Sequence, residues 1–172
     1  MRQDKDFERT VKGELAVLYR VARRMGATKE QSEDAVQSTL LKAFQAWDRF
    51  DGRHPRSWLI RILRNERLMA IRSERDEVSL NEDASSSIPE QDGWDQVIWK
   101  IEADRVLLEL ENLPDIYKLA IQLCDVEQMS YEEAADAMDV PIGTVRSRLF
   151  RARTMLRNRL LATSARLERV TS

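Results

Sequence analysis

The sequence predicts an all-α fold made of two small helical domains joined by a flexible acidic linker, the C-terminal one containing a helix-turn-helix. Three observations lead to this prediction. Only 5 glycines and 4 prolines occur in 172 residues, and so few turn-forming residues argue against a β-sandwich or barrel. Apolar residues recur at helical spacing in both halves of the chain. A polar, serine-containing segment without any apolar period separates the two halves.

The first half is expected to contain three helices. Leu15, Leu18, Tyr19, Ala22 and Met25 mark the first, and Gly26 follows at the position where glycine commonly ends a helix. Ser32 is expected to cap the second. The apolar stripe of the second helix consists of Ala35, Val36, Thr39, Leu40, Ala43, Phe44 and Trp47. The third helix is expected over residues 56–72, with Trp58, Leu59, Ile62 and Leu63 facing inward.

The segment 76–93 is acidic and contains too few apolar residues to offset the entropy cost of its own ordering. It is therefore interpreted as the linker, with one domain over residues 1–75 and the other over residues 94–172. In the second domain, Val97, Ile98, Ile101, Val106, Leu108 and Leu110 are expected to line one helix. Pro114 suits the first turn of the next helix, whose apolar stripe includes Cys124 as a buried thiol.

Ser130 and Glu133 form a predicted capping box, in which the serine caps a helix and the glutamate reaches back to it. The helix runs from Tyr131 to about Met138, and a turn at Val140–Gly143 follows. Thr144 is expected to cap a longer helix that reaches about Leu160. Its inward stripe is Val145, Leu149, Ala152, Leu156 and Leu160, and its other faces are rich in arginine. A short helix, a glycine-containing turn and a longer basic helix predict a helix-turn-helix.

Charge is unevenly distributed, although the net charge is only −2. Eight arginines lie between Arg49 and Arg75, eleven acidic residues lie between Asp76 and Glu111, and eight arginines lie between Arg146 and Arg169. Two separated basic segments favour two contacts with a polyanion such as DNA. Arginines on solvated helix faces are the simpler alternative.

Several classes of protein are not favoured by the composition. With one cysteine, Cys124, and one histidine, His54, the chain offers no internal disulfide, cysteine-based zinc site or Ser-His-Asp triad. No enzyme activity, cofactor or metal is therefore expected. The N-terminal residues do not resemble a signal peptide, and no apolar run approaches 18 residues. These features predict a cytoplasmic protein without direct membrane insertion.

Three segments resemble bacterial sigma factors of the sigma-70 family, extracytoplasmic-function (ECF) group. Residues 130–153, SYEEAADAMDVPIGTVRSRLFRAR, resemble region 4. Residues 33–50, EDAVQSTLLKAFQAWDRF, resemble region 2.2 and its continuation, and residues 56–65, RSWLIRILRN, resemble regions 2.3 and 2.4. The resemblance spans nearly the whole chain and implies a promoter-specificity subunit of RNA polymerase. Partners implied by it are core RNA polymerase, through its β′ clamp helices and β flap, promoter DNA and an anti-sigma factor.

The resemblance implies roles for three sets of residues. The −35 element is expected to be read by the helix after the turn, where arginine can bind guanine and Phe150 can meet a thymine methyl or lie partly buried. The residues are Thr144, Arg146, Ser147, Arg148, Phe150 and Arg151. The −10 element is expected to contact Arg61, Arg64 and Asn65, because an asparagine can bind an extruded base and arginines can follow the single strand. Core polymerase is expected to bind Asp34, Gln37, Ser38 and Leu41.

Two positions depart from the family pattern. The family usually has glutamate where Ser38 stands and often an aromatic residue where Ile60 stands, which puts one polymerase contact and one stacking ring in doubt. A helix-turn-helix regulator that acts without polymerase remains the alternative function. The sequence also suggests self-restraint, in which acids of the linker and of the helix near residues 97–111 lie against Arg61, Arg64 and Arg67, or against the helix after the turn, when DNA is absent.

Overall fold

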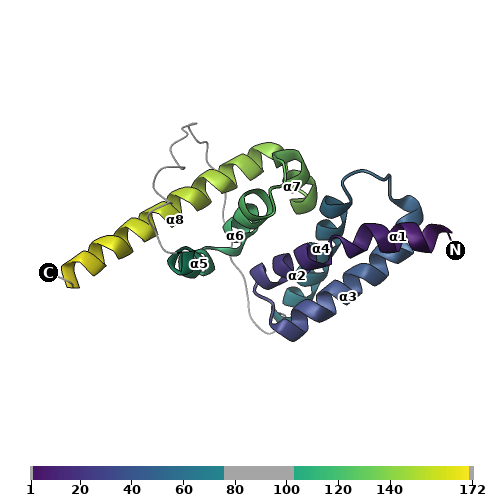
Figure 1. Ribbon diagram of the computed structural model, residues 1–172, viewed down its shortest axis with the longest axis horizontal. Coiled ribbons are helices and arrows are strands. Elements are labelled where there is room, and N and C mark those ends of the chain that lie inside the picture. Colours follow the sequence, from purple (N-terminus) through teal and green to yellow (C-terminus); the bar gives the residue numbers. More distant parts are fainter. Residues whose placement is uncertain (1, 76–102, 171–172) are drawn as a thin grey trace.

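The computed structural model describes residues 2–75 and 103–170, and all of the regular structure within these ranges is helical. This confirms the predicted all-α fold (Figure 1). The proposed linker, together with Val97, Ile98 and Ile101, lies outside the described residues. The first half contains α1 (Arg2–Lys12), α2 (Leu15–Arg24), α3 (Lys29–Gln45), the short 3₁₀ helix η1 (Trp47–Arg49) and α4 (Pro55–Arg75). The second contains α5 (Ala103–Glu111), α6 (Asp115–Ile121), the π-helical η3 (Gln122–Val126), α7 (Tyr131–Met138) and α8 (Ile142–Val170).

In the first half, α2 lies at the centre and packs against both α3 and α4. Its core residues Leu18, Val21 and Ala22 are completely buried. Gly26 has a φ of +78°, a conformation that costs glycine little, so it ends the helix as the sequence predicts. The helix α1 lies before the first predicted helix and was not predicted. Its Phe7 packs against Phe44 of α3, with ring centroids 5.2 Å apart.

The predicted start of α3 is wrong by one turn. Thr28, not Ser32, is the N-cap, because its hydroxyl accepts a hydrogen bond from Gln31 N and the Gln31 side chain accepts one from Thr28 N. Ser32 is fully buried and donates its hydroxyl hydrogen to the Thr28 carbonyl at 2.7 Å. A glutamine can complete a capping box as glutamate does, so the three residues before Ser32 are also helical.

In the second half, α6 and α7 both pack against α8. The predicted stripe of α8 is confirmed, since Val145, Leu149, Ala152, Leu156 and Leu160 are all at most 2 % exposed. Leu108, however, is 63 % exposed, whereas Leu110 is buried. The helix α5 therefore presents a narrower apolar face than predicted. Pro114 is the N-cap of α6 and lies immediately before its first turn.

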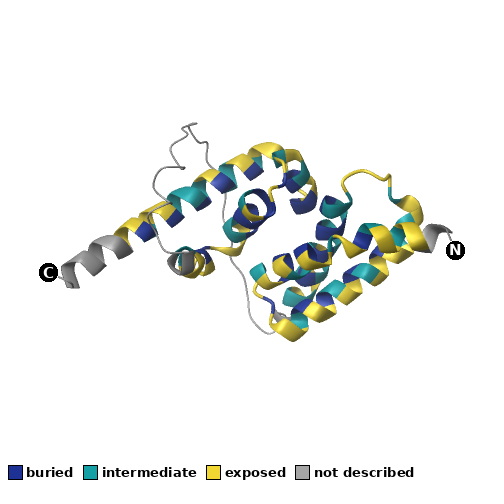
Figure 2. Cartoon of the chain, viewed as in Figure 1, coloured by how far each residue is buried: buried dark blue, intermediate teal, exposed yellow. Residues whose placement is uncertain are grey.

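The two halves pack against each other. The helix α7 lies along α4, and α2 contacts α6 and η3 (Figure 1). Buried residues occur on the facing surfaces of both halves as well as within each half (Figure 2). Helices far apart in the sequence thus form one continuous apolar cluster, which includes Ile60 of α4 and Ala137 of α7.

Candidate nucleic-acid and polymerase interfaces

The helix α7 is positioned by the predicted capping box. Glu133 N donates to Ser130 Oγ at 3.2 Å, and Ser130 N donates to Glu133 Oε2 at 2.9 Å. The backbone hydrogen bond from Ser130 lowers the pKa of Glu133, with burial acting against it. Asp139 ends α7 in the left-handed conformation, with φ +54°. These two ends fix the turn that leads into α8.

The helix α8 begins at Ile142, two residues before the predicted cap. Thr144 lies inside the first turn, where its backbone N–H donates to the Pro141 carbonyl at 2.9 Å. The first turns of α8 are therefore accessible to solvent on the side opposite the buried stripe. Of the predicted −35 residues, Arg146 is exposed, Phe150 is 37 % exposed, and the other four are half-buried: Thr144, Ser147, Arg148 and Arg151.

Not every arginine of α8 is available for DNA. Arg153 donates two hydrogen bonds to the carboxylate of Asp125, at 3.2 and 2.6 Å. These contacts hold η3 against α8 and raise the pKa of Arg153. Arg159 Nη1 lies 3.9 Å from Glu109 Oε2 of α5. Both arginines hold helices of the second half together, a role that charge counting along the sequence does not reveal.

The predicted −10 residues share one side of α4, because Arg61, Arg64 and Asn65 are spaced by three and four residues. Asn65 is exposed and the two arginines are half-buried. Arg61 is paired with the Asp136 side chain of α7, and its Nε donates to the Asp136 carbonyl at 2.9 Å. Ile60 is fully buried, so this position faces the interior in this structure.

An aromatic cluster lies beside the start of α4. Phe50 and Trp58 stack with ring centroids 4.5 Å apart and an interplanar angle of 22°. Trp47 lies 5.2 Å from Phe50 and 6.0 Å from Trp58, again between centroids. All three residues are half-buried. The rings pack on one another, in agreement with the packing role expected for Trp47 and Trp58, and they connect η1 and Phe50 to the start of α4.

The predicted polymerase residues form one exposed face of α3. Asp34, Gln37, Ser38 and Leu41 are all exposed and fall on one side of the helix at steps of three and four residues. Leu41 is 60 % exposed, although the neighbouring residues Thr39 and Ala43 are fully buried. The structure thus brings these four side chains together on a surface that no other part of the described chain covers.

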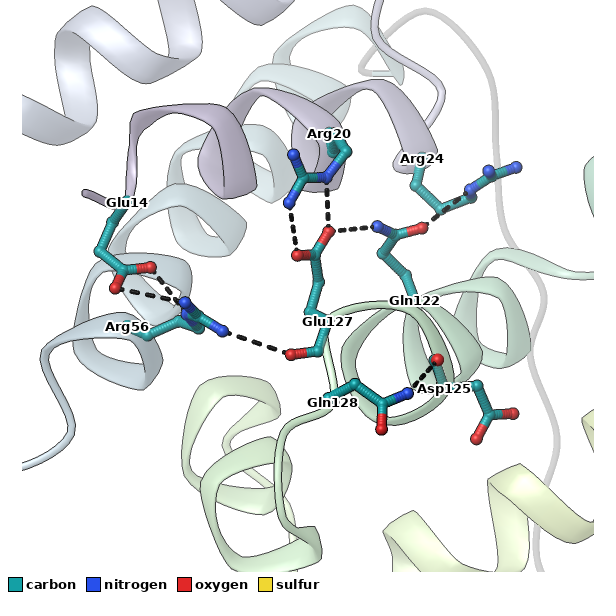
Figure 3. A network of polar contacts seen from close by, with 8 residues as sticks. All are labelled: Glu14, Arg20, Arg24, Arg56, Gln122, Asp125, Glu127 and Gln128. Carbon is teal, nitrogen blue, oxygen red and sulfur yellow. Dashed lines mark hydrogen bonds and ion pairs between the residues drawn. The ribbon is translucent and has the colours of Figure 1, made fainter. Parts of the chain in front are cut away.

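A network of polar side chains connects the two halves, and the sequence did not predict it (Figure 3). Arg20 of α2 donates two hydrogen bonds to the carboxylate of Glu127, at 2.8 and 2.6 Å. The Glu127 side chain is only 4 % exposed and also accepts from Gln122 Nε2 at 2.8 Å. Arg56, itself held by Glu14, donates to the Glu127 carbonyl at 3.3 Å. Arg24 pairs with Glu111 at 2.5 Å.

The charge states in this network follow from its geometry. The hydrogen bond from Arg20 lowers the pKa of Glu127, and burial acts against this effect without reversing it. The same hydrogen bond raises the pKa of Arg20. Both groups are therefore charged at neutral pH. Residues that are 107 positions apart make this pair, and no local pattern in the sequence links them.

The described residues contain neither an exposed thiol nor a metal-binding cluster. Cys124 is buried, and burial raises the pKa of its thiol to about 12, as suits a packed side chain. Within residues 2–75 and 103–170, no three His, Cys, Asp or Glu side chains gather where they could hold a metal ion. None of the helices in the described parts of the chain has the length and apolar character needed to cross a membrane.

Comparison with known protein families gives two matches in the order of the two halves. The family described as Sigma-70 region 2 matches residues 11–77. The family described as Sigma-70, region 4 matches residues 103–156. The first match contains α2, α3 and α4, and the second contains α7 and the N-terminal half of α8.

Individual proteins agree with these matches. An ECF RNA polymerase sigma-E factor of Haemophilus influenzae is 33 % identical over 138 residues, which cover 74 % of this chain and 73 % of that protein. The ECF RNA polymerase sigma factor SigE of Mycolicibacterium smegmatis is 32 % identical over 147 residues, which cover 83 % of this chain and 57 % of that protein.

A solved structure extends the agreement to three dimensions. The sigma factor RpoE of Bartonella quintana, in complex with the anti-sigma factor NepR, superposes with a TM-score of 0.70 at 31 % identity and covers 92 % of this chain and 98 % of that one. CnrH, in complex with the cytosolic domain of CnrY, gives a TM-score of 0.62 at 26 % identity and covers 92 % of this chain and 90 % of that one. The chain therefore belongs to the sigma-70 family, in the extracytoplasmic-function group of RNA polymerase sigma factors.

Proposed function

We propose that this sigma factor binds core RNA polymerase through the exposed face of α3 and reads its promoters with α8 and α4. The observation that carries the proposal is the separation of three surfaces by the fold. The family resemblance assigns three tasks to three sets of residues, and each set lies on its own surface. These surfaces are an exposed face of α3, the basic N-terminal end of α8 and a polar face of α4. Domain boundaries near residues 75 and 94 are part of the same proposal.

The helix α8 is suited to the −35 element. In a helix-turn-helix the second helix enters the major groove and presents its N-terminal residues to base edges. Arg146 and Arg151 can bind the O6 and N7 atoms of guanine, and Phe150 can contact a thymine methyl group. Thr144 and Arg148 then contact phosphates, which position the helix without carrying sequence information.

The polar face of α4 is suited to the −10 element. Asn65 offers both a donor and an acceptor to an extruded base. Arg61 and Arg64 lie beside it and can follow the backbone of a single strand. The chemistry of RNA synthesis belongs to the polymerase in this proposal, and the sigma factor supplies recognition and strand separation.

Regulation by an anti-sigma factor is also proposed, because one solved relative is a complex with the anti-sigma factor NepR. The other solved relative is a complex with the cytosolic domain of CnrY. The β′ clamp helices are the proposed polymerase partner of α3, and the β flap is proposed for the second half.

In vitro transcription with core polymerase on a promoter library tests the proposal. A positive charge introduced on α3, by Asp34→Arg or Gln37→Arg, should weaken core binding at least several-fold, because both side chains are exposed on the proposed contact face. Glu8→Arg, on an exposed position of α1, is a control for the change in charge. Both α3 variants should keep the helical content of the wild type.

The alternative is a helix-turn-helix regulator that acts without polymerase. Gel-shift experiments with and without core polymerase separate the two functions. Promoter binding that needs core polymerase supports the sigma factor, whereas unchanged core affinity in both α3 variants would remove this face from the interface. Tight, sequence-specific binding by the chain alone, indifferent to polymerase, would favour the regulator.

A further inference from the structure

We infer that Met69 of α4 is a further base-reading residue of this sigma factor, which selects a thymine methyl group one or two nucleotides from the base bound by Asn65. The inference rests on the proposed function, because it extends the proposed −10 surface of α4. It adds an apolar contact to a surface on which the sequence predicted only a polar residue and two arginines.

Met69 is exposed, although the apolar residues around it are not. It is 61 % exposed, whereas every other apolar residue of α4 up to Ser73 is buried or half-buried. No other part of the described chain covers its side chain, which is unbranched, polarizable and able to pack against surfaces of many shapes. Single exposed apolar residues are common on protein surfaces, so the position of Met69 on α4 decides what it can do.

Met69 lies on the face that carries the proposed −10 residues. Asn65, Met69 and Arg72 are all exposed and are spaced by four and three residues, so they share one side of α4. Arg61 begins the same strip one turn before Asn65. The strip therefore has an arginine at each end, with the asparagine and the methionine between them.

The charge beside this strip suits a nucleic-acid strand. Glu66 is the one acidic residue between positions 61 and 73. Its carboxylate is paired with Lys42 of α3, with Nζ and Oε1 2.5 Å apart. A phosphate backbone can therefore lie along the strip without facing an unpaired carboxylate, and Met69 can meet a base of that strand.

The rise of the helix sets how far along the strand Met69 reaches. At 1.5 Å per residue, Met69 lies about 6 Å beyond Asn65 along the helix axis. Stacked nucleotides of one strand follow one another at about 3.4 Å. Met69 therefore meets a base one or two nucleotides from the base that Asn65 binds. Arg72 lies about 4.5 Å farther along the axis and is placed to contact a phosphate of the same segment.

The chemistry of the methionine side chain favours a methyl group as its target. A thioether has no hydrogen-bond donor and is only a weak acceptor, so it cannot read the polar edge of a base. Thymine carries a C5-methyl group, which proteins recognise by apolar contact. Burial of one methyl group corresponds to about fourfold in affinity, which is the size of the preference that we expect.

Pairs of bases that differ only by a methyl group test the inference. Holoenzyme assembled from the full chain and core polymerase is bound to promoter DNA that is already unpaired over the −10 element. The variant Asn65→Ala identifies the base that Asn65 binds, because the preference for that base should be lost. Thymine is then compared with uracil, and 5-methylcytosine with cytosine, at each position within about two nucleotides on either side.

The wild type should prefer the methylated base of both pairs about fourfold at one of these positions. Met69→Ala should lose this preference, and Met69→Leu should keep it because leucine is also apolar. Met69→Gln, which has a similar length and a polar end, should lose it. Ser73→Ala, at an exposed position one turn farther along α4, is the control and should behave as the wild type.

Three results would overturn the inference. The wild type could lack a methyl preference at all of these positions, the preference could persist in Met69→Ala, or Met69→Ala could lose affinity for core polymerase, which would place Met69 against the polymerase. Failure of the proposed function looks different, since the wild type would then not direct core polymerase to any promoter. In that case the same base pairs are compared in single-stranded oligonucleotides bound by the full chain alone, and loss of the preference in Met69→Ala still decides the role of Met69.

Discussion

The arginines of this chain differ in what their guanidinium groups meet. Arg20 and Arg153 each hold a carboxylate by two hydrogen bonds, and Arg67 is 5 % exposed. Arg146, by contrast, is exposed at the start of α8. A sequence-level count treats all of them as one basic surface. The proposed DNA contacts are confined to exposed or half-buried arginines at the N-terminal end of α8 and on one side of α4.

Arg151 and Arg148 are expected to contribute differently to promoter binding. Arg151→Ala should cost about 1–3 kcal/mol at one −35 position and relax base preference there, because a base contact is lost. Arg148→Ala should weaken binding to all sequences alike and reduce its salt dependence, because a phosphate contact is lost. Binding of a −35 variant set at several salt concentrations distinguishes the two, with Arg157→Ala, farther along α8, as the control. Uniform losses in both variants would contradict the assignment of Arg151 to base readout.

At the level of elements, α7 and α8 are the best predicted because their signals are local. A capping box and an inward stripe lie within a few residues of one another, and the structure confirms both. The predicted start of α3 is wrong because two residues that can cap a helix, Thr28 and Ser32, lie four residues apart. The exposure of Leu108 could not be predicted, because an apolar period does not show whether a partner covers that face. The polar network depends on contacts about a hundred residues apart.

The capping box of α7 provides a test at this level. Ser130→Ala should lower the free energy of unfolding by about 1 kcal/mol, because an N-cap hydroxyl is lost. Ser130→Asp should retain most of the stability, since aspartate is an equally good cap. Ser73→Ala, at an exposed position late in α4, is the control. Urea denaturation followed by circular dichroism measures the stability of all three variants. A Ser130→Ala curve that overlays the wild-type curve would show that the N-cap hydroxyl does not contribute to stability.

For the whole molecule, the order of charge along the chain predicted that acidic residues would restrain basic ones, and the structure shows which ones meet. Arg61 is paired with Asp136 of α7, not with an acid near residues 97–111. Arg67 is buried and is not placed as an exposed partner. Acids of the linker lie outside the described residues. The observed contact therefore involves the helix-turn-helix itself and lies beside the proposed −10 residues of α4.

Acid is expected to separate the two packed halves of the chain, with Glu127 as one of the groups responsible. The pKa of Glu127 is lowered in the packed arrangement by Arg20, with Gln122 and Arg56 adding to the effect. A lowered pKa stabilises this packing above the ordinary value of 4.5, and this contribution is lost as the pH falls through the lowered pKa. The distance between spin labels at Arg53→Cys and Glu132→Cys, two exposed positions on the two halves, should therefore stay constant between about pH 7 and pH 5 and lengthen only at lower pH.

Glu127→Gln separates this contribution from the titration of the exposed carboxylates. The variant cannot form the ion pair with Arg20, so its halves should be farther apart at neutral pH than those of the wild type. Its remaining response to acid should be smaller, because the group whose pKa is lowered has been removed. Circular dichroism at each pH checks that the helices persist, so that separation is distinguished from unfolding. A longer label distance in the wild type between pH 7 and pH 5, or the same acid response in both proteins, would show that Glu127 does not control the packing of the two halves.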